Sequence, residues 1–288
     1  MATSTKKKSK RRAARAKSRT GWRTARTSDR HELYELSVQE PAAEIAFIER
    51  IWKERRGGRP RLLREDFCGT GFASCEWVKR RAVPRAWGID LCTRTMAWGK
   101  ARHGAGLTPE QRGRMSWVKG DVRAGGTPPA DVIAGLNFSY FIFKTRAGLL
   151  EYFRAALRNL RPGGILFLDA YGGYESFSVQ KEERDLDGFT YVWDTERYNP
   201  INGDVLNHIH FRFPDGTELR KAFTYDWRLW TLAEIQEALL EAGFVRPAVY
   251  WEGTTKEGEG DGVFRRKSVG EACGGWIAYI VAERPLRA

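Results

Sequence analysis

The stretch that most constrains this 288-residue chain runs from Arg64 to Gly71 and reads Arg-Glu-Asp-Phe-Cys-Gly-Thr-Gly. Two leucines precede it, and apolar residues follow it at helical spacing, which predicts a buried strand that turns sharply into a helix. Gly69 and Gly71 allow backbone angles that other residues avoid, and the helix start presents free N–H groups to a ligand. A solvated edge strand with an ordinary glycine turn is the alternative.

Three adjacent charged residues in this strand need partners, because burying an unpaired charge costs several kcal/mol. Side chains alternate along a strand, so Arg64 and Asp66 share one face and are expected to pair. Glu65 then lies on the opposite face, where it can meet a ligand hydroxyl or ammonium.

Most of the net charge of +13 lies at the start of the chain. The first 30 residues hold 12 Lys or Arg and one acid, whereas the remaining residues hold 37 basic and 35 acidic side chains. Residues 1–28 contain almost no large apolar side chain and are predicted to be a disordered basic tail. The tail could solubilise the protein, act as a nuclear or organelle address, or anchor a nucleic acid.

No apolar run approaches the roughly 20 residues of a membrane-spanning helix. Four cysteines lack Cys-x-x-Cys spacing, and no apolar segment near the start of the chain resembles a secretory signal. We therefore expect reduced thiols and a cytoplasmic location, or a nuclear or organelle one if the tail is an address.

Strand and helix patterns alternate along most of residues 29–288, which predicts one α/β domain. Helices are expected at 29–39, 42–55, 94–102, 147–160 and 231–242, and further strands at 85–90, 115–119, 131–138, 165–170, 245–251 and 276–283. Residues 187–227 interrupt the alternation with three predicted antiparallel strands. A mobile loop is expected around 256–262.

Acidic residues follow successive predicted strands. Asp90 ends the second strand, where dinucleotide-binding folds hold a ribose, and Asp121 follows the third strand beside Val122. Each acid alone could be a turn residue or a helix cap. Together with Glu65 they indicate one ligand site at the carboxyl ends of the strands.

This order of features resembles the class I S-adenosylmethionine-dependent methyltransferases over about residues 40–285. The acid-x-Gly-x-Gly-x-Gly motif of that family aligns with residues 65–71, with Phe67 in place of the first glycine. The resemblance implies a Rossmann-like seven-stranded methyltransferase sheet with helices on both faces, and a small antiparallel β insert after strand five. Residues 29–78 also look like a bacterial branch of the family near the small-molecule N-methyltransferases.

The resemblance implies S-adenosyl-L-methionine as cofactor, with Glu65 near its ammonium, Asp90 on its ribose and Asp121 on its adenine amino group. The residues expected at the cofactor are Tyr34, Arg64, Glu65, Cys68, Gly69, Thr70, Gly71, Asp90, Leu91, Asp121, Val122 and Asn137. Helix 29–39 is expected to cover the cofactor through Tyr34 and Gln39. A Rossmann dehydrogenase is the rival interpretation, but Ser74 occupies the place of its third glycine.

Methyl transfer is an in-line displacement, and alignment of donor and acceptor can supply up to about 7 to 11 kcal/mol without a triad or a metal. Asn137 and Tyr140 have the spacing of the Asn-Pro-Pro-Tyr motif of methyltransferases acting on adenine, and they are the candidate catalytic residues. The insert resembles the sheet that covers the acceptor in glycine-type and sugar-amine N-methyltransferases.

Candidate acceptor contacts are Tyr171, Trp193, His210 and Arg228, with Tyr174, His208 and Arg212 as further members of the set. His208 and His210 could also ligate a metal, but no third ligand is evident and no metal is expected. We expect the acceptor to be an amine or hydroxyl of a small molecule. A nucleic acid or protein held by the basic tail is the alternative, as is a cofactor-binding protein without catalysis.

Overall fold

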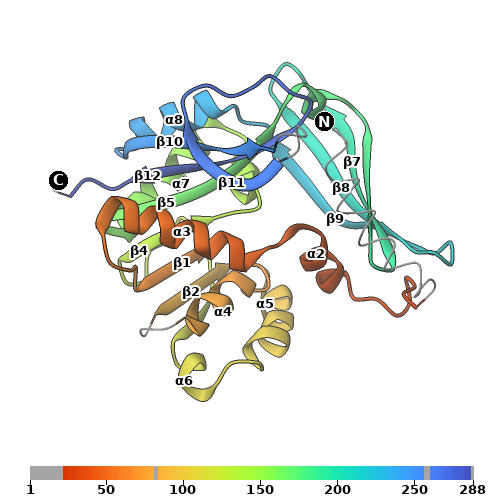
Figure 1. Cartoon of the computed structure of the whole chain (residues 1–288), viewed down its shortest axis with the longest axis horizontal. Coiled ribbons are helices and arrows are strands. Elements are labelled where there is room, and N and C mark those ends of the chain that lie inside the picture. Colours follow the sequence, from red (N-terminus) through yellow and green to blue (C-terminus); the bar gives the residue numbers. More distant parts are fainter. Residues whose placement is uncertain (1–21, 81–83, 256–259, 287–288) are drawn as a thin grey trace.

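The computed structural model describes residues 22–80, 84–255 and 260–286, which form a large mixed sheet flanked by helices and a smaller antiparallel sheet beside it (Figure 1). Within these residues, no helix combines the length and the apolar character needed to cross a membrane.

The large sheet has eight strands in the order β11-β10-β12-β5-β4-β1-β2-β3. Its strands are β1 Leu62–Asp66, β2 Arg85–Asp90, β3 Met115–Lys119, β4 Ala130–Gly135, β5 Leu160–Gly172, β10 Val245–Thr254, β11 Gly260–Lys267 and β12 Trp276–Glu283. Strands β1 to β5 are parallel, so their carboxyl ends meet at one edge of the sheet, while β12 runs antiparallel to β5. The predicted Rossmann-like sheet is confirmed.

Helices cover both faces of this sheet, as predicted. The α-helices of the described residues are α2 Arg30–Val38, α3 Pro41–Arg56, α4 Phe72–Lys79, α5 Thr93–Gly99, α6 Pro109–Arg112, α7 Arg146–Asn159 and α8 Leu232–Glu241. Apolar residues of α3 and α4 form one core cluster with alternate residues of β1, β4 and β5, and α7 and α8 form a second cluster with the intervening residues. Because strand side chains alternate, the two clusters lie on opposite faces.

The smaller sheet has four antiparallel strands in the order β6-β7-β8-β9, one more than predicted. They are β6 Lys181–Leu186, β7 Phe189–Tyr198, β8 Asp204–Arg212 and β9 Glu218–Arg228. Strand β6 reads Lys-Glu-Glu-Arg-Asp-Leu, which lacks apolar alternation because it is an exposed edge strand, where charged side chains are common. Figure 1 shows α2 between this sheet and the main body.

Three expected boundaries are wrong for local reasons. Strand β4 ends at Gly135 rather than residue 138, because Asn137 and Phe138 adopt φ values of 59° and 57° and leave the ladder. Strand β5 already begins at Leu160, the last residue of the expected helix, rather than at residue 165. Residues 260–267 form β11 against β10 where a loop was expected, which gives the sheet its eighth strand; residues 256–259 of that loop lie outside the described part.

The predicted tail mostly lies outside the described residues, but its last seven positions are described. The backbone N–H of Ala25 donates to Thr217 Oγ1 at 2.9 Å, and Arg23 forms an ion pair with Glu32 at 3.2 Å. Residues 22–28 therefore contact the end of the small sheet and helix α2, and the prediction of disorder is wrong for them.

Candidate functional site

The turn between β1 and α4 has the backbone that its glycines predict. Gly69 and Gly71 have φ values of 53° and 62°, and a Cβ at Gly71 would lie 2.4 Å from the ring of Trp117. Phe67 also has positive φ, at 57°, in the position where the methyltransferase motif has its first glycine. Left-handed backbone costs an L-residue roughly 1–2 kcal/mol, and packing of the Phe67 ring on Tyr152, with centroids 5.4 Å apart, offsets part of this.

Asp90 joins this turn to the end of β2. Its carboxylate accepts from the N–H of Gly69 at 2.8 Å and from the N–H of Cys92 at 2.7 Å. A carboxylate offers about four acceptor positions, so two remain for ligand hydroxyls. Leu91 beside it is 65% exposed, which leaves an apolar surface next to the predicted ribose position.

Glu65 lies on the face of β1 opposite Arg64, as predicted. One of its oxygens accepts from the N–H of Ser74 at 2.9 Å and also from the Ser74 hydroxyl, which ties the strand to the first turn of α4. Burial raises the pKa of Glu65 to about 7. Its other oxygen has no hydrogen bond within the described part of the chain.

Glu65 belongs to a group of three carboxylates on the α3 side of the sheet, with Asp169 and Glu44. Asp169 lies on β5 two residues after Phe167 of the same core cluster, and it accepts the N–H groups of Asn137 and Phe138, each at 2.8 Å. Burial raises the pKa of Asp169 to about 7 and that of Glu44 to about 8, and the nearby charges of Asp169 and Glu65 contribute to the rise at Glu44. None of the ion pairs among the described residues includes any of the three.

Glu44 was not singled out from the sequence. It lies in the first turn of α3, whose N-terminal end reaches the carboxyl edge of the sheet because the helix runs antiparallel to β1. In the sequence, only its position on a helix before the glycine turn could have indicated a role in the site. An acid in the first turn of a helix is ordinarily explained by the helix dipole, so this position did not single it out.

Arg64 and Asp66 pair as predicted, with Nε and Oδ1 2.7 Å apart. Arg64 also donates to the Val122 carbonyl and to Thr127 Oγ1, so it fixes the segment after β3. Only 1% of the surface of Arg64 is exposed, so its side chain supports the strand from within the core, and its assignment to the cofactor stays a prediction.

Asp121 does not have a free carboxylate. Both of its oxygens accept from Arg123, with the shortest contact 2.6 Å, and the Arg123 backbone N–H adds a further bond at 2.8 Å. This fork occupies much of the acceptor capacity of the carboxylate, and the expected bond to an adenine amino group stays a prediction. Val122 beside it is buried and packs against the core.

Cys68 and Thr70 contribute to the turn through packing and the main chain. Cys68 is 3% exposed, and a Cβ placed at Gly88 would lie 3.0 Å from its Sγ. The Thr70 hydroxyl donates to Glu35 at 2.6 Å, so it is not available to a ligand.

The two candidate catalytic residues lie in different environments. Tyr140 is completely buried, and its hydroxyl donates to the Asp169 carbonyl at 2.9 Å. Burial and this bond hold the ring within the core, and its catalytic role stays a prediction. Asn137 is half-buried in the turn after β4, held by the Asp169 carboxylate, and its side chain is placed at the carboxyl edge of the sheet.

Aromatic side chains form a wall between the two sheets. Trp193 of β7 lies 6.1 Å from Tyr171 and 5.9 Å from Tyr225, and Tyr34 of α2 lies 5.0 Å from Phe223 (ring centroids). We call Tyr34, Tyr171, Trp193, Phe223 and Tyr225 the aromatic wall; all five are half-buried. The structure thus brings the predicted residues Tyr34, Tyr171 and Trp193 together, but Tyr34 contacts β9 rather than the glycine turn.

The other residues predicted to contact the acceptor do not lie on the aromatic wall. His210 lies on the other face of β8, with Nε2 3.1 Å from Asp194 Oδ2, and His208 lies beside it with Nδ1 2.9 Å from Thr224 Oγ1. Burial lowers the pKa of His210, while Asp194 raises it.

Arg228 forms an ion pair with Glu234 at 2.9 Å and stacks on Trp230, Arg212 pairs with Glu183, and Tyr174 is 66% exposed. His210 and Arg228 therefore stabilise the outer face of the small sheet and the start of α8, and their assignment to the acceptor stays a prediction.

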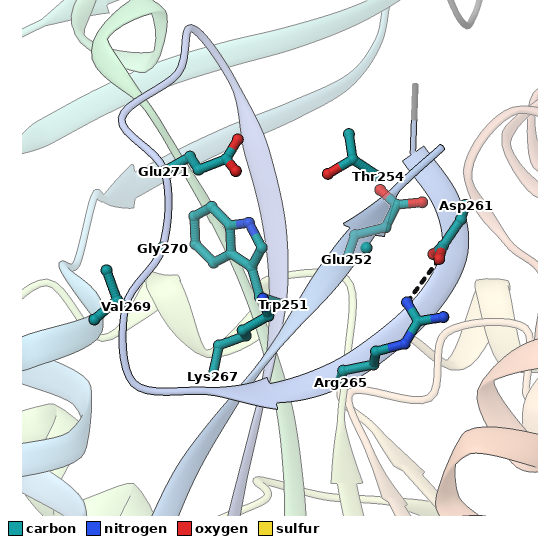
Figure 2. A pocket seen from close by; sticks show the side chains of 10 residues that line it. Trp251, Glu252, Thr254, Asp261, Arg265, Lys267, Val269, Gly270 and Glu271 are labelled. Carbon is teal, nitrogen blue, oxygen red and sulfur yellow. Dashed lines mark hydrogen bonds and ion pairs between the residues drawn. The ribbon is translucent and has the colours of Figure 1, made fainter. Parts of the chain in front are cut away.

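Among the described residues, the strand-end site has no metal-binding group beside it, and a cavity of the structure lies elsewhere. Within residues 22–80, 84–255 and 260–286, no group of three or more His, Cys, Asp or Glu could hold a metal ion. A cavity of about 350 Å³ lies between β10, β11 and residues 269–271, lined by Trp251 and by the Asp261–Arg265 ion pair (Figure 2). None of the residues discussed above lines it, so it is separate from the strand-end site.

No family model and no curated protein matches the chain in sequence. Solved structures match its fold. An S-adenosylmethionine-dependent methyltransferase from Clostridium acetobutylicum ATCC 824 is similar over 88% of this chain and 97% of its own, with a TM-score of 0.66 and 15% identity. The chain therefore has the fold of the S-adenosylmethionine-dependent methyltransferases.

Two further similar structures are methyltransferases whose names refer to a sugar. An amino pentose methyltransferase from Micromonospora echinaspora, solved with S-adenosylmethionine bound, covers 88% of this chain and 95% of its own at a TM-score of 0.62 and 19% identity. A sugar N-methyltransferase from Streptoalloteichus sp ATCC 53650 covers 90% and 93%, at a TM-score of 0.59 and 21% identity.

Proposed function

We propose that the protein is an S-adenosylmethionine-dependent methyltransferase that acts on an amine or hydroxyl of a small molecule. The cofactor binds at the carboxyl ends of β1, β2 and β4, where the two glycines let it approach the main chain of the turn and Asp90 supplies acceptors for the ribose hydroxyls. The fold supports this placement, because ligands of open α/β sheets bind at the carboxyl ends of the strands.

The observation that carries the proposal is the group of three carboxylates without a basic partner, Glu44, Glu65 and Asp169. S-adenosylmethionine carries a sulfonium and an ammonium, and either cation near these acids would favour their ionised forms. A nicotinamide dinucleotide brings two phosphate anions, which the same carboxylates would repel. The charge of the site therefore favours a cationic cofactor over a dinucleotide.

In this site the protein aligns the acceptor with the methyl group and excludes water, while the cofactor supplies the reactive methyl. The aromatic wall closes the side that faces the small sheet, and Asn137 orients the acceptor at the end of β4. An amine must lose a proton before its nitrogen can attack the methyl carbon. Burial raises the pKa of Glu44 to about 8 in the ligand-free protein, and Glu44 is the group we assign to accept that proton once the cations of the cofactor favour its ionised form.

A methyl-transfer assay tests the acceptor class. The protein is incubated with S-adenosylmethionine labelled in its methyl group and, separately, with panels of small amines, small alcohols, total RNA, DNA and unfolded protein. We expect label in a small amine or alcohol, and at least a tenfold lower yield from Trp193→Ala than from a control variant, Trp22→Ala, whose ring lies beside Gly188. Label found only in RNA, DNA or protein would contradict the proposal.

A further inference from the structure

Glu35 of α2 contacts the glycine turn directly. Only 8% of the residue is exposed, and its Oε1 accepts from the Thr70 hydroxyl at 2.6 Å. Nε2 of His103, just after α5, lies 2.7 Å from the same oxygen, and the His103 ring stacks on Phe72 with centroids 4.2 Å apart. One buried carboxylate oxygen thus joins the N-terminal helix, the glycine turn and the segment after α5.

The opposite side of α2 belongs to the small sheet. Leu33 is fully buried in a cluster with residues of β7 and β8, and Tyr34 packs on Phe223 of β9. His31 lies between the two bodies, 5.3 Å from Trp98 of α5 and 5.7 Å from Phe223 (ring centroids). Helix α2 therefore touches both the turn that would hold the cofactor and the sheet that carries much of the aromatic wall.

Thr70 stands between Gly69 and Gly71, both with positive φ. Glycines in this conformation have few steric restraints, so contacts with other elements hold the backbone of the turn in one arrangement, among them the bond from the Gly69 N–H to Asp90. The Thr70 hydroxyl is the one side-chain group of this turn that makes a short bond to another element. Hydrogen bonds to a charged acceptor are roughly twice as strong as neutral ones.

We propose that Glu35 is a positioning residue, which holds the Cys68–Gly71 turn in its cofactor-binding conformation through Thr70. This inference rests on the proposed function of the same site. It also accounts for α2 as the cover of the cofactor, although not through Tyr34: Glu35 ties the helix to the turn, while Leu33 and Tyr34 tie it to the small sheet.

The test measures binding of S-adenosylhomocysteine by calorimetry to the full chain and its variants. Thr70→Val removes the hydroxyl and Glu35→Ala removes its acceptor, and each is expected to weaken binding about 10- to 100-fold. Thr70→Ser and Glu35→Gln keep a donor and an acceptor, so they should restore most of the affinity. Glu32→Ala is the control: it removes a half-buried acid of α2 that pairs with Arg23 at 3.2 Å and makes no bond to Thr70, and it should bind as the wild type does.

A double variant separates this role from two independent contacts. If the two residues act through one bond, Thr70→Val/Glu35→Ala should bind about as well as the weaker single variant, because coupled residues are not additive. Fully additive losses, or unchanged affinity in Glu35→Ala, would overturn the role of Glu35 while leaving the proposed function intact. Failure of the wild type to bind would overturn the proposed function, and the inference with it.

Discussion

The guanidinium of Arg64 and the carboxylate of Asp66 are 2.7 Å apart on the α7 side of β1, and their side chains are 1% and 0% exposed. Tyr152 of α7 donates to the second oxygen of Asp66 at 3.2 Å, and Arg64 holds the Val122 carbonyl. The pair therefore links the central strand to a covering helix and to the segment after β3, beneath the proposed cofactor site.

Removing one charge of this pair should destabilise the fold. Asp66→Asn leaves the buried guanidinium of Arg64 without its counter-ion, and we expect the free energy of unfolding to fall by about 3 to 5 kcal/mol. Urea denaturation measures this change. Asp187→Asn, on the exposed turn between β6 and β7, is the matched control and should change stability by less than about 0.5 kcal/mol. A midpoint for Asp66→Asn equal to that of the control would contradict the importance of the pair.

The unpaired carboxylates predict how the stability of the ligand-free protein depends on pH. Burial raises the folded-state pKa of Glu44 to about 8 from an ordinary 4.5, so the folded state binds more protons than the unfolded state between these values. This contribution to stability is present at low pH and is lost as the pH rises through 8. Glu44→Gln removes it, so the variant should lose less stability than the wild type between pH 5 and 8.5.

Thermal unfolding at these two pH values checks this expectation, with Glu54→Gln on the exposed side of α3 as the control. The control should show the wild-type pH dependence. Equal pH dependence in Glu44→Gln and the wild type would mean that Glu44 ionises freely, and the proposed cation site would lose its main support.

Helices and strands with a clear periodic pattern of apolar residues were predicted well, because that pattern arises when only one side of the element is buried. Helix α8 begins at the capping box of Thr231 and Glu234, which sequence alone identifies. Strand β6 was missed because it buries almost nothing, and β11 because its Gly-Asp-Gly start is typical of a loop.

The candidate site was predicted less completely, because the sequence places residues along an edge but not the side-chain partners. Asp90 has the expected position and free acceptor capacity, whereas Asp121 is bound by Arg123 only two residues away. Tyr140 was assigned from spacing alone, and its burial follows from the left-handed turn at residues 137–138. Glu35 and Glu44 were missed because their meaning depends on long-range contacts with Thr70 and with the strand ends.

The basic start of the chain offers a test between substrate classes. Residues 1–21 contain nine Lys or Arg, and engagement of half of them with duplex phosphates would give a slope near −4 in a plot of log affinity against log salt, at about −0.9 per phosphate. A small acceptor needs no such contact. We expect a chain beginning at Trp22 to keep the turnover of the full chain on its small acceptor. Loss of that turnover, or RNA methylation that requires the first 21 residues, would contradict a small-molecule substrate.

The central claim is that the carboxyl edge of the sheet binds S-adenosylmethionine, and isothermal calorimetry with the full chain tests it most directly. We expect one site per chain for S-adenosylmethionine and S-adenosylhomocysteine. Asp90→Ala should weaken binding by about 1.5 to 3 kcal/mol, because it removes a charged acceptor of hydroxyl groups, whereas Asp187→Ala should leave it unchanged. Absence of binding of either compound up to millimolar concentration would contradict the account.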